Sequence, residues 1–275
     1  MSDDAGEGYA VRLGDLLNMI FDTHAHYDDG WFDEDREALL GSMQAAGVGR
    51  IVNIGSDWKS LARTKALTQQ YDFIYGAYGI HPDEIGDLDE GRFTQLREFL
   101  AEEKAVAVGE IGLDYYHNAD NKTEQKEWFE RQAFLAKELG LPVVIHSREA
   151  AEDTLHMAKT RHFEDIGGVV HCFSYSWEIA REYIRMGFFI GVGGVVTYKN
   201  GRRLKETVEQ MPFSALVLET DCPYLSPEPH RGKRNHSGNL HHVVRMIAEI
   251  RGITEQEVEE TTWQNACRLY GMNTM

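Results

Sequence analysis

Ile20-Phe21-Asp22-Thr23-His24-Ala25-His26 is the stretch from which the fold of this 275-residue chain can be worked out. Ile20–Thr23 is a short apolar run that predicts a buried strand, and His24 and His26 stand where that strand should end. Residues two apart on a strand point to the same side, so both imidazoles can reach one metal ion. A lone His-x-His is weak evidence, because two incidental histidines would give the same pattern.

Seven further apolar runs alternate with helical patterns. The expected strands are Ile51–Ile54, Phe73–Tyr78, Ala105–Val108, Pro142–Ile145, Gly168–Val170, Phe188–Gly191 and Leu216–Leu218. The expected helices lie near 35–46, 58–71, 93–103, 123–139, 150–159, 178–186, 204–210 and 240–250, before a last helix with the capping-box pair Thr254 and Glu257. This alternation predicts a single α/β domain, a (β/α)8 TIM barrel. A doubly wound open sheet is disfavoured, because no Gly-rich phosphate-binding fingerprint follows the first strand.

Composition limits the class of protein. The formal net charge is -17, which argues against binding nucleic acid through the whole surface but allows a local basic mouth with bound cations. Three cysteines form no CxxC pair, so we expect no disulfide framework and a reducing, cytoplasmic compartment. No apolar run is long enough to cross a membrane, and residues 1–18 show no signal-peptide pattern. We expect no membrane association and no obligate protein partner.

Residues 1–18 differ in character from the rest of the chain. They are acidic and precede Met19, which directly adjoins the first predicted strand and would be a natural start. We expect residues 1–18 to be an N-terminal extension outside the core and residues 19–275 to form the barrel.

Polar side chains stand at the ends of five predicted strands. They are His24, His26, Glu110, His146, His171 and Asp221. Barrel active sites lie at the C-terminal ends of the strands, so these groups should meet at one mouth. A single histidine is more often a structural residue than a ligand, but six such groups would be costly to bury without a partner. Four histidines and two carboxylates suit a two-metal site in which Glu110 binds one ion through each oxygen. One ion would share Glu110 with the first and eighth strands, the other with the fifth and sixth.

Six segments together resemble the TatD family of metal-dependent deoxyribonucleases, within the amidohydrolase-like barrels. They are Phe21–His26, Gly109–Tyr115, Pro142–Arg148, His171–Ser174, Glu219–Leu225 and Arg231–Asn235. The resemblance spans Met19 to about Tyr270 and implies the same six ligands. It also implies hydrolysis of phosphodiester bonds, with 3′-to-5′ exonuclease action on DNA, single-stranded or at a 3′ end. His236 stands where TatD-like proteins usually carry Glu, which bears on the start of the following helix rather than on the metals.

The chemistry of such a site needs an activated water and neutralised phosphoryl oxygens. Two divalent cations would lower the pKa of a water that bridges them. Asp221 is the candidate to accept its proton in addition to ligation, and Glu110 is assigned to catalysis as the shared ligand. Imidazole and carboxylate suit Zn or Mn, and the family makes Mg plausible, so the identity of the two ions stays open.

Other side chains near the mouth are candidates for supporting roles. Substrate contacts are predicted for His81, Arg148, Arg231 and Arg234, although surface salt bridges are an equally common use of arginine. Asp22 and Glu219 could orient ligating histidines. Tyr115, Tyr116 and Phe173 could stack on bases, unless they only pack.

Two other functions stay open. A carbonyl hydrolase acting on an ester, lactone, amide or aminoacyl-tRNA would use the same two-metal scaffold, because folds do not determine substrates. A non-catalytic metal-binding or scaffold protein is the least favoured, since open metal positions are expected. The basic side chains of the mouth favour a phosphate-containing substrate.

Overall fold

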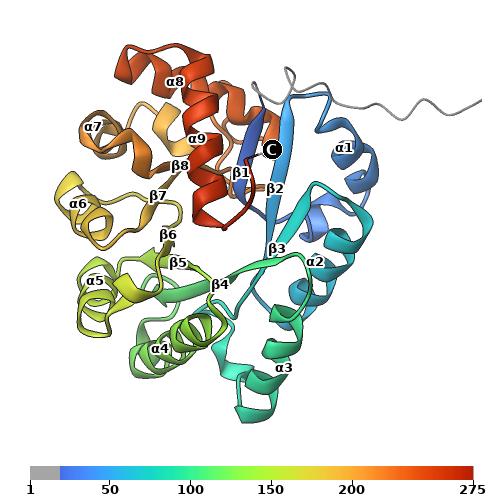
Figure 1. Ribbon diagram of the computed structural model, residues 1–275, viewed down its shortest axis with the longest axis vertical. Coiled ribbons are helices and arrows are strands. Elements are labelled where there is room, and N and C mark those ends of the chain that lie inside the picture. Colours follow the sequence, from blue (N-terminus) through green and yellow to red (C-terminus); the bar gives the residue numbers. More distant parts are fainter. Residues whose placement is uncertain (1–18, 275) are drawn as a thin grey trace, which may run out of the picture.

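The computed structural model describes residues 19–274, which form an eight-stranded parallel sheet nearly closed into a barrel (Figure 1). The strands neighbour one another in chain order, and the helices between them lie around the outside. The predicted TIM barrel is therefore confirmed. The extension predicted for residues 1–18 lies outside the described residues.

Each predicted strand is present. The strands are β1 (Ile20–Ala25), β2 (Val48–Gly55), β3 (Ile74–Tyr78), β4 (Ala105–Asp114), β5 (Val143–Arg148), β6 (Gly168–Val170), β7 (Phe189–Val192) and β8 (Leu216–Leu218). The helices are α1 (Arg36–Ser42), α2 (Trp58–Gln70), α3 (Glu90–Leu100), α4 (Lys122–Leu139), α5 (Ala151–Thr160), α6 (Trp177–Arg185), α7 (Arg202–Gln210), α8 (Leu240–Arg251) and α9 (Glu255–Leu269). The capping box predicted at the start of α9 is confirmed, with Thr254 and Glu257 bonded reciprocally.

Several strands run past the apolar runs that predicted them, and β4 and β5 do so by the most residues at their C-terminal ends. β4 continues to Asp114 and β5 to Arg148, so Glu110 and His146 lie inside their strands rather than after them. The two strands stay paired along this extension. Gly112 permits it, because its φ is +148° and a Cβ there would lie 1.9 Å from the carbonyl oxygen of His146. The extension carries both side chains into the mouth of the barrel.

One helix is shorter than expected. The pattern near 35–46 gives α1 only as far as Ser42. The helix is followed by turns over residues 43–47, where the backbone N–H of Val48 donates to the carbonyl of Met43 at 3.0 Å. Gly47, at φ +79°, adopts the left-handed conformation that commonly ends a helix and turns the chain into β2.

The seam between β1 and β8 is held differently from the other strand pairs. Within residues 19–274 these strands share no ladder, and an isolated bridge joins Ala25 to Cys222. The hydroxyl of Thr23 donates to the carbonyl of Leu218 at 2.8 Å, and the hydroxyl of Tyr270, just past α9, donates to the carbonyl of Thr23 at 2.8 Å. Buried side-chain bonds therefore supplement sparse backbone pairing at the point of closure.

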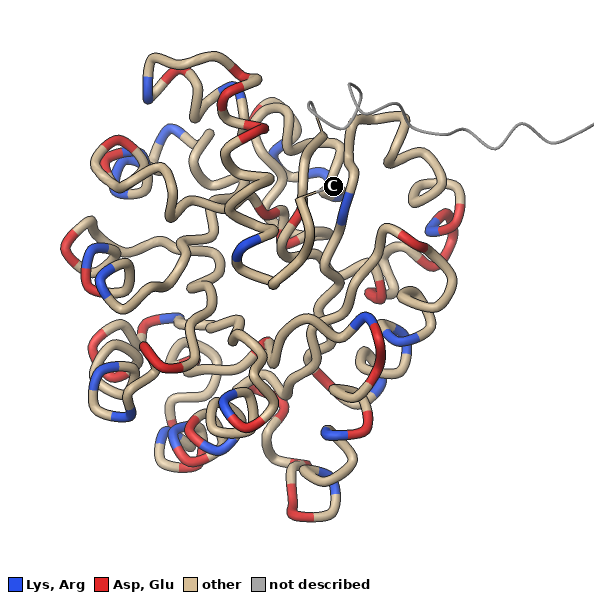
Figure 2. Tube along the Cα trace, viewed as in Figure 1, with Lys and Arg blue, Asp and Glu red and all other residues tan. Residues whose placement is uncertain are grey.

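Charged residues lie along the helices and loops, where acidic and basic positions are interspersed (Figure 2). The described part of the chain contains no helix that combines the length and apolar character needed to span a membrane.

Candidate metal centre

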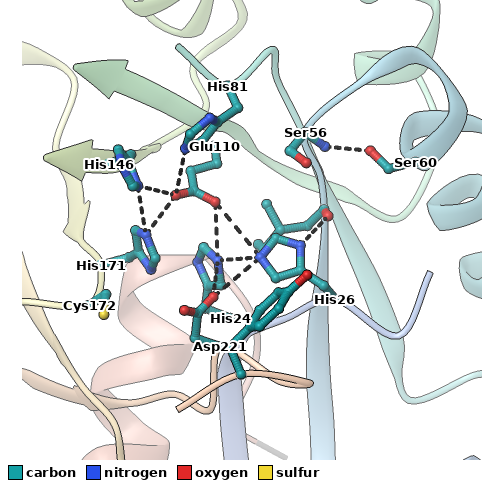
Figure 3. A network of polar contacts seen from close by, with 12 residues as sticks. His24, His26, Ser56, Ser60, His81, Glu110, His146, His171, Cys172 and Asp221 are labelled. Atoms are coloured by element: carbon teal, nitrogen blue, oxygen red, sulfur yellow. Dashed lines mark hydrogen bonds and ion pairs between the residues drawn. The ribbon is translucent and has the colours of Figure 1, made fainter. Parts of the chain in front are cut away.

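His24, in β1, and His26, directly after it, meet Asp221, which follows β8, at one side of the mouth (Figure 3). The Nε2 atoms of His24 and His26 lie 3.1 Å apart. Oδ1 of Asp221 lies 3.7 Å from the first of these nitrogens and 3.4 Å from the second. Oε2 of Glu110, from β4, lies 3.4 and 3.8 Å from the same two atoms. These four atoms form the first donor set.

The spacing of the first donor set fits a single metal ion. A tetrahedral ion with bonds of about 2.0–2.2 Å holds its ligand atoms roughly 3.3–3.6 Å apart. Five of the six separations within the set range from 3.1 to 3.8 Å. The ring of His26 is fixed from behind, because its Nδ1 lies 3.0 Å from the carbonyl oxygen of Ile54. Its Nε2 therefore points into the set.

A second donor set lies beside the first. Oε1 of Glu110 is 2.7 Å from Nδ1 of His146 and 2.6 Å from Nε2 of His171, and these nitrogens are 3.4 Å apart. Nε2 of His81 stands 3.8 Å from the same oxygen. Glu110 thus presents one carboxylate oxygen to each set. The set offers three close donors, which leaves room for further ligands if it holds an ion.

Without metal, the buried carboxylates of the two donor sets shift the pKa values of the histidines beside them. Burial opposes the protonated form of His26, but the carboxylates around it, Asp221 foremost, together raise the pKa of His26 to about 10. Burial likewise opposes protonation of His146, while Asp114 and Glu110 raise its pKa to about 9. Despite burial, nearby histidines hold the pKa of Glu110 well below its usual value. Protons on imidazoles balance buried carboxylates at positions where bound cations would serve the same purpose.

Asp114, at the end of β4, is a site residue that reasoning from the sequence missed. Its Oδ2 lies 3.1 Å from Nε2 of His146, the ring nitrogen turned away from Glu110. Its Oδ1 accepts from the backbone N–H groups of Tyr116 and His117, each at 2.8 Å. A carboxylate behind a ligating imidazole sets the orientation and tautomer of the ring. The available signal was spacing: residues 110, 112 and 114 share one face of a strand.

Asp22 supports the first donor set through the backbone. Its Oδ1 accepts from the N–H groups of His24 at 3.2 Å and Thr220 at 3.0 Å. Its Oδ2 accepts from the hydroxyls of Thr220 and Ser237, each at 2.7 Å. Burial raises the pKa of Asp22 to about 6. Asp22 therefore positions the main chain of His24, not its ring.

Glu219 lies under the rings of His24 and His171, which stack with their centroids 3.9 Å apart. Its Oε1 accepts from the backbone N–H of Cys172 and lies 3.9 Å from Nδ1 of His171. Among the described residues, Nδ1 of both rings and Oε2 of Glu219 are buried without a hydrogen-bond partner. Burial raises the pKa of Glu219 to about 8. Glu219 is thus placed beside the Nδ1 edge of His171, the edge opposite the Nε2 that faces Glu110.

The donor sets open into a cleft of about 900 Å³. His81 and Arg148 line this cleft, as do Lys59 and Arg63 from α2. Carboxylates outside the two sets also line it: Asp28, Asp29, Asp57, Asp83, Glu84 and Asp114. Apart from the metal ligands, the lining is therefore more acidic than basic.

The two other predicted arginines lie outside the cleft lining. The guanidinium of Arg231 stacks over the ring of Tyr198, 4.3 Å from its centroid. Arg234 forms two hydrogen bonds with the carboxylate of Asp35, at 2.8 and 2.6 Å, and donates to the carbonyl of Trp31 at 2.7 Å. Their substrate contacts stay a prediction, and the contacts of Arg234 give it a structural task in the loop after β1.

A barrel with clustered histidines and carboxylates at the C-terminal ends of its strands defines a class, the metal-dependent hydrolases. A family model described as TatD related DNase matches residues 21–271. The chain belongs to the TatD family.

Individual relatives agree with this assignment. The chain is 43% identical over 255 residues to the metal-dependent hydrolase YabD of Bacillus subtilis, covering 93% of this chain and 100% of the relative. It is 32% identical over 260 residues to the 3′-5′ ssDNA/RNA exonuclease TatD of Cronobacter sakazakii, covering 92% and 98%. The crystal structure of YjjV, a TatD homologue from Escherichia coli K12, matches with a TM-score of 0.88 and 31% identity, covering 94% and 100%. The protein is a TatD-family metal-dependent hydrolase.

Proposed function

We propose that this hydrolase cleaves phosphodiester bonds of DNA with two metal ions and removes nucleotides from the 3′ end. The observation that carries the proposal is the placement of Glu110, whose two oxygens each face a separate donor set. Pairs of metal ions that share a ligand are typical of enzymes that displace groups at phosphorus. The name of the Cronobacter sakazakii relative and the description of the family point to the same chemistry.

When bound, two divalent cations lower the pKa of a water molecule and neutralise charge on phosphoryl oxygens. The side chains supply the rest. Asp221 directs Oδ1 at the two histidines of the first set, so Oδ2 is the atom that accepts a proton from the attacking water. Arg148 lines the cleft, and no carboxylate of residues 19–274 forms an ion pair with it. Its guanidinium is available to hold a non-bridging phosphate oxygen.

A carbonyl hydrolase on the same scaffold is the second candidate. The acidic lining of the cleft favours it, because carboxylates such as Asp57 and Asp83 repel a polyanion but not a neutral ester or lactone. The activated water attacks a carbonyl carbon as well as phosphorus, and the fold does not distinguish the two.

A metal-reconstitution assay separates these candidates. The purified protein is stripped with a chelator and supplied with Mg²⁺, Mn²⁺ or Zn²⁺ separately. Release of nucleotides is followed on single-stranded DNA labelled at either end. The Glu110→Gln variant removes the shared carboxylate, and Glu84→Gln, in the same cleft but outside both sets, is the matched control.

The proposal predicts metal-dependent trimming from the 3′ end that Glu110→Gln abolishes and Glu84→Gln retains. Two bound ions without cleavage of DNA by any metal would reject it. Esters, lactones and aminoacyl-tRNA would then be the substrates to assay.

A further inference from the structure

The three most exposed large apolar side chains of the described residues lie on loops that follow strands, and one of them, Tyr224, lines the cleft. Trp31, Tyr116 and Tyr224 are 60%, 57% and 47% exposed. Trp31 lies in the loop after β1, Tyr116 in the loop after β4 and Tyr224 in the loop after β8. Large aromatic rings exposed next to a cleft are a common mark of a binding surface. Two other aromatic residues were predicted either to stack on bases or only to pack. Phe173 is buried, and the hydroxyl of Tyr115 donates to Asp153.

Trp31 and Tyr224 form one aromatic unit, with ring centroids 5.9 Å apart. A carboxylate between them fixes both: Oδ1 of Asp29 accepts from the backbone N–H of Trp31 at 2.7 Å, and Oδ2 accepts from the hydroxyl of Tyr224 at 3.0 Å. Arg234 braces the same loop through the carbonyl of Trp31. The rings are therefore held in place although they face solvent, so a ligand need not order them on binding.

Tyr116 and Arg148 form a second unit across the mouth. The guanidinium carbon of Arg148 lies 4.2 Å from the centroid of the Tyr116 ring. The backbone of Tyr116 is anchored by the carboxylate of Asp114. A planar cation layered on an aromatic ring presents a flat surface on which a nucleobase stacks, while its N–H groups, which lie in the plane of the guanidinium, stay free for a phosphate oxygen.

The two units stand on loops at opposite sides of the barrel mouth. In a barrel whose eight strands follow chain order, the loops after β1 and β8 lie opposite those after β4 and β5 (Figure 1). The donor sets stand between them, with His24 on β1 and His146 on β5 (Figure 3). A phosphodiester held at the metals would have one neighbouring nucleotide near each unit.

We propose that Trp31–Tyr224 and Tyr116–Arg148 are two base-stacking platforms that hold the nucleotides on either side of the scissile phosphate of single-stranded DNA. This proposal rests on the proposed nuclease function and names its substrate as an unpaired strand. The acidic lining leaves little affinity to come from phosphates, so the faces of the bases must supply it. Bases splayed to opposite sides of the mouth cannot remain paired, which excludes an intact duplex.

The test measures binding and cleavage separately. Binding is followed by fluorescence anisotropy of a labelled ten-nucleotide single strand on the full chain, with Ca²⁺ in place of the reactive metals. A strand of equal length built from abasic residues, and a duplex of the same sequence, are the other probes. The variants are Trp31→Ala and Tyr116→Ala with the conservative Trp31→Phe and Tyr116→Phe. Phe134→Ala, an exposed ring on α4, is the control.

Each alanine variant should weaken binding of the base-bearing strand by about tenfold or more, the usual effect of losing one stacked base. The phenylalanine variants and Phe134→Ala should stay within about twofold of the unmodified protein. The abasic strand should bind as weakly to the unmodified protein as to the alanine variants, and the duplex should bind no better.

The platforms would be rejected if the alanine variants bound the base-bearing strand as tightly as the unmodified protein does. They would also be rejected if the alanine substitutions weakened binding of the abasic strand as much as binding of the base-bearing strand, or if no single strand bound at all. Cleavage of the same strands with Mn²⁺ tells the two proposals apart. Cleavage without ring-dependent binding keeps the nuclease and rejects the platforms. Binding that depends on the rings, with no cleavage under any metal, keeps the platforms and rejects the nuclease.

Discussion

Nε2 of His146 lies 3.1 Å from Oδ2 of Asp114, while Nδ1 of the same ring lies 2.7 Å from Glu110. One imidazole is thus held between two buried carboxylates, and only the second of them belongs to a donor set. The arrangement determines which nitrogen of His146 faces the second donor set.

Replacing Asp114 with Asn should weaken metal binding in the second set. The amide keeps the shape of the side chain but loses the charge that favours one tautomer of His146, and such changes typically cost 10–100-fold in metal affinity. Titration calorimetry with Zn²⁺ or Mn²⁺ on the stripped protein measures it. Asp153→Asn, which alters the partner of the Tyr115 hydroxyl outside the centre, is the matched control and should bind normally. Equal affinities for both variants would contradict the orienting role.

Replacing Asp221 with Asn should lower kcat by about 10²–10⁴-fold, the range contributed by a positioned general base. The amide can still offer Oδ1 to the first set, so metal content should be retained in part. Metal analysis of each preparation is needed to interpret the rate. A variant that holds both ions and keeps full activity would refute proton transfer to this carboxylate.

Metal binding should release protons near neutral pH. In the metal-free protein the pKa of His26 is about 10 and that of His146 about 9, so both rings are protonated at pH 7.5. Ligation requires the neutral imidazole, and the two rings belong to different donor sets, so the apparent affinity of each set should rise about tenfold per pH unit below the pKa of its ring. Calorimetry in buffers of different ionisation enthalpy should give about two protons released. Release close to zero would show that these rings are not ligands.

Binding of single-stranded DNA should depend only weakly on salt. Of the lysines and arginines that line the cleft, Arg63 is already paired with Asp33, which leaves Lys59 and Arg148 for phosphates. Each neutralised phosphate of a single strand contributes a slope of about −0.7 in log K against log salt, so the total should be roughly −1 to −2. A slope steeper than about −4 would reveal a basic track beyond this cleft.

Much of the fold and of the centre could be predicted because both obey a local rule. The runs before His24, His146 and His171 are short and apolar, and parallel strands bring the residues at their C-terminal ends to one edge of the sheet. Asp114 escaped because the glycines of β4 suggest a loop, whereas Gly112 is a paired strand residue whose missing Cβ admits the next strand. At that point the local sequence favours a loop, whereas pairing with the neighbouring strand makes the segment a strand.

The Trp31–Tyr224 unit illustrates the opposite case. Nothing near Trp31 in the sequence indicates that its ring stays exposed yet fixed. The brace comes from Arg234, which is distant in the chain and paired with Asp35. Tyr224 joins the unit through Asp29 in the same way. Such features depend on contacts between remote segments, so they became visible only with the fold in hand.

Because β1 and β8 meet at the seam, the first donor set can assemble only after the last strand of the barrel has been synthesised. His24 and His26 emerge with the first strand, and Asp221 comes after the last. The backbone N–H of Asp221 donates to the carbonyl of His24 at 2.9 Å, so the first donor set exists only once those strands have met. A truncated or half-folded copy therefore has no complete first set. An ion that needs all four donors of this set could bind only after the barrel has closed.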